Sequence, residues 1–173
     1  MKNKKLILSS ITLSVTAMSA SCQTVSGWYV APTLSLTINT PHRQDHLGEA
    51  VGLAIGKVLN DQWNIELAGQ VANFGAHDRQ GNIGLDALYF LNRNRSFAPY
   101  ATLGMGYVHE GGAPKHESGD YQNLMLRGGL GFTTKIMQRV DLRMDARYQW
   151  HGATSGGPRL GDWFISAGIN YSF

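Results

Sequence analysis

Charged and apolar side chains alternate along residues 139–152, which read RVDLRMDARYQWHG. Asp141, Arg143, Asp145 and Arg147 occupy every second position, and mostly apolar residues fill the gaps. Because successive side chains of a strand point to opposite faces, this stretch would have one apolar face and one face of acids and bases. The pattern therefore predicts ion pairing on one side of a strand whose other side lies in an apolar environment.

Histidine is the other residue type whose placement suggests chemistry. All six histidines fall in or beside four long polar segments: His42, His46, His77, His109, His116 and His151. Imidazole titrates near pH ~6.5 and binds divalent metals, so His42, His46, His77 and His116 are candidates for a weak metal site. The alternative is that histidine is simply a polar residue suited to loops. No strong metal motif, nucleotide-binding loop or catalytic triad spacing is present, and no cofactor is predicted.

The two-residue period of 139–152 recurs along the chain. In the last stretch, apolar residues from Trp163 to Phe173 alternate mainly with small or polar ones. Eight such stretches of about ten or more residues follow one another from Trp28 onwards, which indicates eight strands.

The connections between these stretches alternate in length. Segments 40–48, 76–81, 111–119 and 153–160 are long, polar and glycine-rich, whereas 60–62, 92–96 and 136–138 are short. This alternation is typical of barrels in the bacterial outer membrane, with both termini in the periplasm. The predicted fold class is all-β, an eight-stranded antiparallel up-and-down transmembrane β-barrel. A soluble lipocalin-like barrel would instead be apolar inside and polar outside.

Aromatic residues support this orientation because they gather near the predicted strand ends. At the short-turn ends lie Trp28, Trp63, Tyr89, Phe97, Tyr171 and Phe173, and near the long-loop ends lie Phe74, Tyr107, Tyr121, Tyr148, Trp150 and Trp163. Two aromatic girdles are expected where a barrel meets the lipid headgroups.

In such a barrel the alternating charges face the lumen. The predicted ion-pair network comprises Glu66, Asp86, Arg127, Asp141, Arg143, Asp145 and Arg147. Eight strands enclose a space that side chains can fill, and buried charges need partners. A nearly neutral set of four acids and three bases therefore favours a plugged lumen over a wide selective pore.

The N-terminus reads as an export signal. Residues 1–5 carry three lysines, an apolar stretch follows to Met18, and 19–21 are small. We expect residues 1–22 to be cleaved and 23–173 to form the barrel domain. Without 1–22 the chain has twelve basic and twelve acidic residues, so its basic pI is no indication of nucleic-acid binding.

Cys22 is the only cysteine, so no intrachain disulfide can form. It would be acylated in a lipoprotein, but Ser19 stands where a branched apolar residue is expected. The alternative is ordinary signal cleavage between about Ser19 and Gln23.

Several short motifs, in order along the chain, resemble the OmpA-like transmembrane β-barrel family, with the barrel domain only. They are GWYV at 27–30, WNIEL at 63–67, PY at 99–100, YQW at 148–150 and INYSF at 169–173. The resemblance implies that Glu66 is the lumenal acid of the third strand that pairs with bases on other strands. It also implies that Tyr171-Ser172-Phe173 is the terminal signal for periplasmic chaperones and the outer-membrane assembly machinery. Asp145 and Arg147 reverse the family's usual order of base and acid, which indicates a rewired network.

Three functions follow from these observations. The first is a structural or adhesin-like surface barrel in the outer membrane of a Gram-negative bacterium, monomeric and without catalysis. The second is a narrow gated channel for ions or small solutes. The third is a lipid A-modifying enzyme, which is disfavoured because position 153 is alanine and the His-x-Ser arrangement of that family is absent after His151.

The expected partners are outer-membrane lipid and lipopolysaccharide, and no nucleic acid. Four predicted loop cations are candidates for contact with lipopolysaccharide phosphates: Arg43, Arg79, Lys115 and Arg159. The alternative is that they are ordinary solvated charges.

Overall fold

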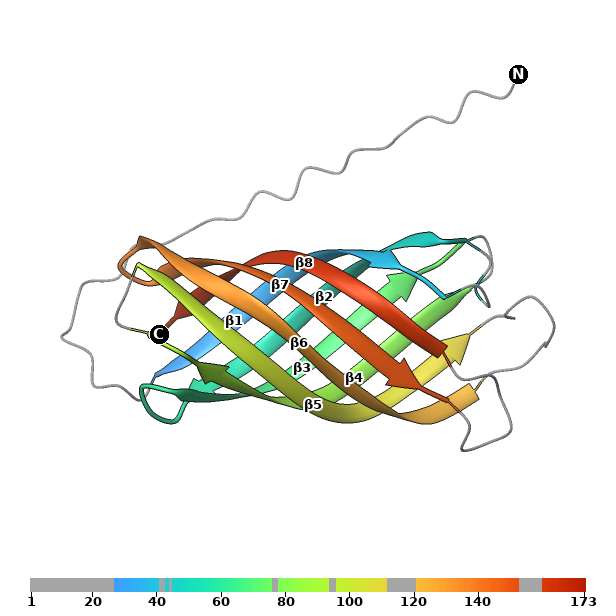
Figure 1. Cartoon of the computed structure of the whole chain (residues 1–173), viewed down its shortest axis with the longest axis horizontal. Coiled ribbons are helices and arrows are strands. Elements are labelled where there is room, and N and C mark those ends of the chain that lie inside the picture. The colour runs from blue at the N-terminus through green and yellow to red at the C-terminus, as the bar shows by residue number, and fades with distance from the viewer. Residues whose placement is uncertain are drawn as a thin grey trace, which may run out of the picture.

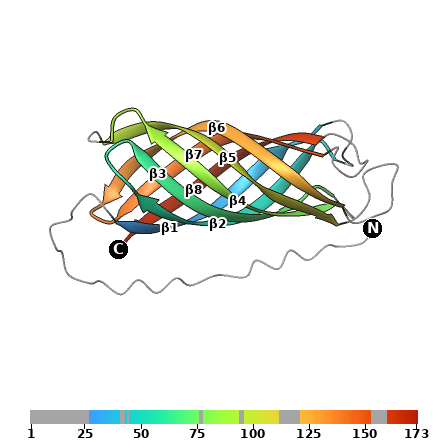
Figure 2. The same ribbon diagram turned by 90° about the horizontal axis from the view of Figure 1, so that it is seen from below.

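The computed structural model describes residues 27–40, 43, 45–75, 78–93, 96–111, 121–152 and 160–173. Its strands are β1 (Trp28–Ile38), β2 (Leu47–Val58), β3 (Trp63–Asn73), β4 (Arg79–Phe90), β5 (Phe97–Gly111), β6 (Tyr121–Met137), β7 (Val140–His151) and β8 (Leu160–Ser172). Each strand pairs antiparallel with the next and β1 pairs with β8, so tilted strands close into a barrel (Figures 1 and 2). The predicted fold class is confirmed. Within the described residues, no helix is long and apolar enough to cross a membrane.

Most strand connections are longer at one end of the barrel than at the other, but the β3–β4 connection is shorter than the β4–β5 connection at the opposite end. Residues 59–62, 91–96 and 138–139 link strands at the end where the C-terminus lies (Figure 1), and 39–46, 74–78, 112–120 and 152–159 link them at the other. The β3–β4 connection is shorter than predicted because 79–81 already pair with β3. Arg79, expected in a loop, is therefore the first residue of β4.

The barrel has an apolar outside and a polar inside. Outward side chains such as Leu34, Val71, Leu103 and Leu130 are 65–71% exposed. The inward positions between them carry the buried acids, bases, amides and hydroxyls. This is the orientation that the alternation predicts, and the reverse of a water-soluble barrel.

Outward aromatic residues lie at both ends of the barrel. Trp63 and Tyr89 are in contact at the short-turn end, with ring centroids 4.9 Å apart, and Tyr148 and Trp163 at the long-loop end, 5.3 Å apart. Phe74 departs from the prediction, because it is fully buried inside the barrel. It follows the last residue of β3, so the outward period no longer applies to it.

Inward-facing glycines make room for large polar side chains. A Cβ at Gly104 would overlap the Asp86 carboxylate, and one at Gly56 would overlap the Tyr29 ring. The narrow lumen therefore accommodates its large polar side chains by omitting side chains on the neighbouring strands.

Candidate functional site

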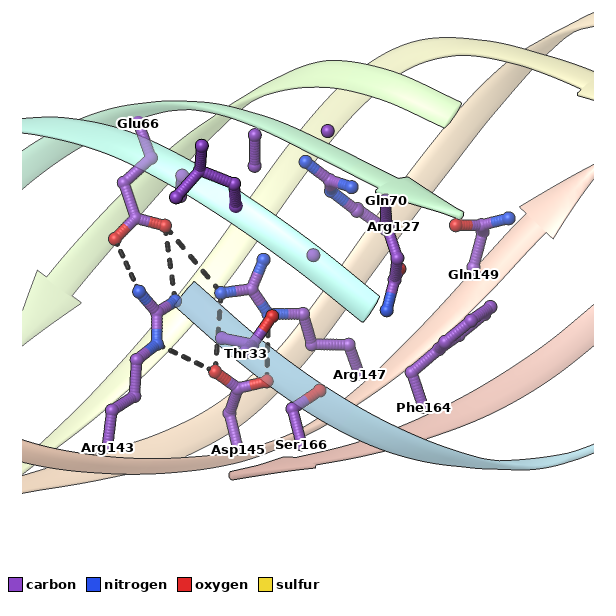
Figure 3. A pocket seen from close by; sticks show the side chains of 15 residues that line it. Thr33, Glu66, Gln70, Arg127, Arg143, Asp145, Arg147, Gln149, Phe164 and Ser166 are labelled. Atoms are coloured by element: carbon purple, nitrogen blue, oxygen red, sulfur yellow. Dashed lines mark hydrogen bonds and ion pairs between the residues drawn. The ribbon is translucent and has the colours of Figure 1, made fainter. Parts of the chain in front are cut away.

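Arg143 lies at the centre of the lumen and bridges two acids. Its Nη1 and Nη2 donate to the two carboxylate oxygens of Glu66 at 2.6 and 3.1 Å, and its Nε donates to Asp145 Oδ2 at 2.9 Å (Figure 3). The same Nε lies 2.9 Å from the Tyr100 hydroxyl, which in turn donates to Asp145 at 2.7 Å. A planar guanidinium suits such two-sided pairing, because its five N–H groups point outwards in one plane.

Arg147 and Arg127 extend this cluster across the barrel to β4. Arg147 contacts Asp145 at 3.1 Å and Asp86 at 2.7 Å, and its Nη2 lies 3.7 Å from Glu66. Arg127 holds both oxygens of Asp86 at 2.6 and 2.8 Å. Strands β3, β4, β6 and β7 are thereby joined through the lumen.

We call the six residues Glu66, Asp86, Arg127, Arg143, Asp145 and Arg147 the central network. Its three acids and three bases balance in charge, and each is in at least one ion pair. All six were predicted from the sequence, and the structure brings them together.

Asp141 is the predicted member that lies apart. It faces the lumen but lines the short-turn mouth with Arg93, Lys135 and Asn64, and it forms no ion pair within 4 Å among the described residues. Strand alternation fixed its face, whereas its distance along β7 places it beyond the reach of Glu66.

A cavity of about 40 Å³ remains beside the central network, lined by Arg147, Gln70, Phe164 and Ser166 among others (Figure 3). A water needs about 10–15 Å³ of such volume together with two or more polar partners, so this cavity suits one or a few waters. No space of solute size is found there.

A second cluster closes the long-loop end, and we call it the Arg43 cluster. Arg43 comes from the β1–β2 connection and is 1% exposed. Its guanidinium lies 2.7 Å from Asp162, 2.9 Å from Glu110 and 3.0 Å from Asp78. Its Cζ also stacks 3.7 Å from the centroid of the Phe74 ring, which explains why Phe74 is inside.

The burial of Arg43 corrects its predicted role, because a side chain enclosed by three acids inside the barrel does not reach lipopolysaccharide phosphates. The other predicted loop cations are placed differently. Arg79 is exposed on the outer face. Lys115 and Arg159 lie outside the described residues.

Among the candidate metal ligands, only His46 lies in the described part, where it is exposed; His42, His77 and His116 fall outside it. No group of three or more His, Cys, Asp or Glu positioned for a metal occurs among the described residues. His151, by contrast, is buried in the lumen with Nε2 at 2.6 Å from Glu110 Oε1. It connects the Arg43 cluster to Gln149 and Asn82, and through them to Arg127.

Sequence reasoning missed several partners of these networks. Tyr29 donates its hydroxyl proton to Glu66 at 2.7 Å, and Tyr100 does the same to Asp145. Both hydroxyls stand at inward positions of β1 and β5, as do Glu110 and Asp162 near the ends of their strands. Strand alternation, carried to every strand end and applied to tyrosine as well as to charges, is the signal that finds them.

Asp78 is expected to make stability depend on pH. Burial raises the pKa of its carboxyl, Arg43 opposes that rise, and Glu110 adds to it. With a raised pKa, the carboxyl group of Asp78 binds its proton more tightly in the folded barrel than in the unfolded chain. The stability contributed by Asp78 is therefore highest at low pH and is lost as pH rises through the raised pKa.

The variant Asp78→Asn is neutral at every pH and still accepts the bond from Arg43. We expect it to unfold at a higher urea concentration than the native protein at pH 7. The difference should vanish below about pH 3, where unfolded Asp is almost fully protonated too. A lower midpoint for Asp78→Asn at pH 7 contradicts this reading.

Known structures of low sequence identity share this fold. Neisserial surface protein A has a TM-score of 0.72 at 16% identity, covering 84% of this chain and 97% of that one. The N-terminal barrel of Pseudomonas aeruginosa OprF has 0.60 at 18% identity, covering 84% and 97%. The outer membrane enzyme PagL has 0.51 at 14% identity, covering 83% and 98%. No protein of curated function matches the sequence significantly.

The sequence also matches a protein family directly, which is stronger support for family membership than structural similarity at low identity. The outer membrane protein beta-barrel domain matches residues 6–173, almost the whole chain. This agrees with the closed eight-stranded barrel, its apolar exterior and its charged lumen, and it confirms the resemblance to OmpA-like barrels. The chain belongs to the family of outer membrane protein beta-barrel domains.

Proposed function

We propose that this protein is an integral protein of the Gram-negative outer membrane, exported by residues 1–22, with a structural or surface-contact role and a lumen closed by ion pairs. The observation that carries the proposal is the burial of two of the lumenal arginines, one at each level of the barrel. Arg43 and Arg143 are 1% and 2% exposed, and each is surrounded by carboxylates. A barrel sealed at two levels has only its outer wall and its loops with which to act.

The outer wall supports a place in lipid. Its large apolar side chains face away from the barrel, and closure leaves no strand edge without a hydrogen-bonding partner. Assembly there is proposed to use Tyr171-Ser172-Phe173 as the signal for the assembly machinery. The long-loop connections then face the outside of the cell and make contact with other molecules.

A narrow gated channel is the second candidate. Polar side chains form a continuous chain of contacts from Arg127 through Asn82, Gln149 and His151 to Glu110, and the small cavity lies beside Arg147. Conduction along this path would require the ion pairs to separate, because the described side chains leave a cavity of only about 40 Å³ beside the central network. Rearrangement is easiest at Arg147, whose side chain is 12% exposed, the most of the central network.

Single-channel recording separates these two functions. Protein expressed from the full-length gene and purified from the outer membrane should give no discrete openings in planar bilayers, and neither should the variant Asp145→Asn/Arg147→Gln. Openings in the native protein that change in the variant would establish the channel and overturn the plug.

An enzymatic role is tested on the same preparation. His151 is turned into the lumen and bonded to Glu110, so it is not available to a substrate at the outer wall. We expect lipid A incubated with the protein to keep all its acyl chains by mass spectrometry. Loss of an acyl chain would overturn the non-enzymatic proposal.

A further inference from the structure

The outer wall contains a hollow where two glycines face outwards on neighbouring strands. Gly69 on β3 and Gly81 on β4 are diagonal neighbours, since Gly69 pairs with Ile83 and Gly81 with Val71. The hollow above them has a volume of about 720 Å³. Its outward walls are Val51, Leu53, Val71, Ile83, Tyr107 and His109.

These glycines are not required by packing inside the barrel. A Cβ at Gly81 would meet no atom within 4 Å, and one at Gly69 would lie 3.6 Å from the nearest, the Asn82 carbonyl oxygen. At Gly84, Gly106 and Gly168, by contrast, a Cβ would collide with backbone atoms of the adjoining strand. The absence of side chains at Gly69 and Gly81 therefore shapes only the outer surface.

Polar groups border the hollow at its long-loop end. Arg79 lies two residues before Gly81 on the same face of β4, is exposed, and forms no ion pair with any described residue. Glu49 faces outwards two strands away. His109 pairs with Gly81 across the sheet and Gln122 pairs with His109, so three polar side chains that can donate hydrogen bonds (Arg79, His109 and Gln122) and one carboxylate (Glu49) stand at one end of an apolar trough.

A second depression of about 610 Å³ adjoins the first and shares Val51 and Val71 with it. Its outward lining includes Leu34, Leu36 and Ile165. Two apolar troughs separated by a ridge of two valines suit a lipid with several acyl chains.

We propose that this hollow binds a phosphorylated, multiply acylated glycolipid of the outer leaflet, the chemistry of lipopolysaccharide, with an acyl chain over Gly69 and Gly81 and a phosphate on Arg79. Guanidinium and phosphate form short, bidentate, charge-assisted hydrogen bonds. His109 and Gln122 supply donors and acceptors for sugar hydroxyls. The choice of leaflet rests on the proposed function, which places the long-loop end outside the cell; the hollow and its cation do not depend on it.

The test is a native mass spectrometry titration of the purified full-length gene product, in mild detergent, with hexa-acylated lipid A and with phosphatidylglycerol as the anionic phospholipid. We expect one lipid A to bind about tenfold more tightly than phosphatidylglycerol. Arg79→Gln should weaken lipid A about tenfold, in line with the loss of one charged hydrogen-bonding group. Gly69→Leu/Gly81→Leu should abolish the preference by filling the hollow.

The matched control is Gly128→Leu, an outward glycine on β6 with room for a Cβ. It should bind lipid A as the native protein does. Equal binding of both lipids, or unchanged lipid A binding in the leucine pair, overturns the proposal. A dimer that the leucine pair removes also overturns it, because the hollow would then be an interface between copies. If the leucine pair does not fold, the lipid A affinity of Arg79→Gln still tests the proposal. Neither binding result depends on whether the lumen conducts, so this test is separate from that of the proposed function.

Discussion

Arg143→Met is expected to lower the free energy of unfolding by about 3–5 kcal/mol, the usual cost of removing one partner of a buried ion pair. The variant removes the cation that pairs with both oxygens of Glu66 and one of the two arginines that pair with Asp145, and both carboxylates are at most 6% exposed. The measurement is a urea titration of the protein folded in lipid vesicles, followed by tryptophan fluorescence. Arg79→Met is the control in vesicles that contain no lipid A, because an exposed arginine without an ion pair should then change the free energy by less than about 0.5 kcal/mol.

A double-mutant cycle distinguishes pairing from simple loss of packing. Glu66→Gln alone should also destabilise the barrel, since Arg143 then keeps only Asp145 of its two acidic partners. The double variant Glu66→Gln/Arg143→Met should cost less than the sum of the single ones by about 0.5–3 kcal/mol, because the two residues are in direct contact. Additive costs would mean that the two residues stabilise the barrel independently.

The central network could be predicted because a strand has a strict two-residue period. Once β7 is recognised, Arg143, Asp145 and Arg147 must share a face, and that face must be the lumen if the other is apolar. Partners on distant strands require the register. Glu66 and Asp86 are neighbours across β3 and β4, and Gly104 leaves the space that Asp86 occupies. Both facts depend on how the strands are aligned with one another, which the sequence of one strand does not reveal.

Asp141 and Arg43 show two limits of the same reasoning. The period determines the face of Asp141 but not its depth, so the sequence pattern alone cannot separate Asp141 from the residues that lie nearer the middle of the barrel. Arg43 lies in a connection that has no period at all. Its inward position depends on Asp78, Glu110 and Asp162 meeting from three other parts of the chain, which only the closed barrel brings about.

The two clusters differ in charge balance, and only the Arg43 cluster depends on a residue from a strand connection. The central network is neutral in itself, so it stands without help from outside the strands. The Arg43 cluster has three acids against Arg43 and a histidine, and Arg43 is the one member supplied by the β1–β2 connection. The conformation of that connection is therefore coupled to charges inside the barrel.

Arg43→Met is accordingly expected to destabilise the protein by about 3–5 kcal/mol, as for a buried pair that loses its cation, although the residue lies in a loop. Arg43→Lys should recover part of this loss, because an ammonium keeps the charge but lacks the planar fork that contacts Asp162, Asp78 and Glu110 together. Arg79→Met again serves as the exposed control in the same urea titration.

Neither Arg43 variant should conduct in planar bilayers, since the central network still fills the lumen below the Arg43 cluster. Opening of the barrel is expected only when both levels are disrupted, in Arg43→Met combined with Asp145→Asn/Arg147→Gln. Discrete openings in Arg43→Met alone would mean that the β1–β2 connection is the sole barrier, and that the central ion pairs leave a path for ions. In the urea titration, an Arg43→Met variant as stable as Arg79→Met would show that Arg43 does not hold the three acids together.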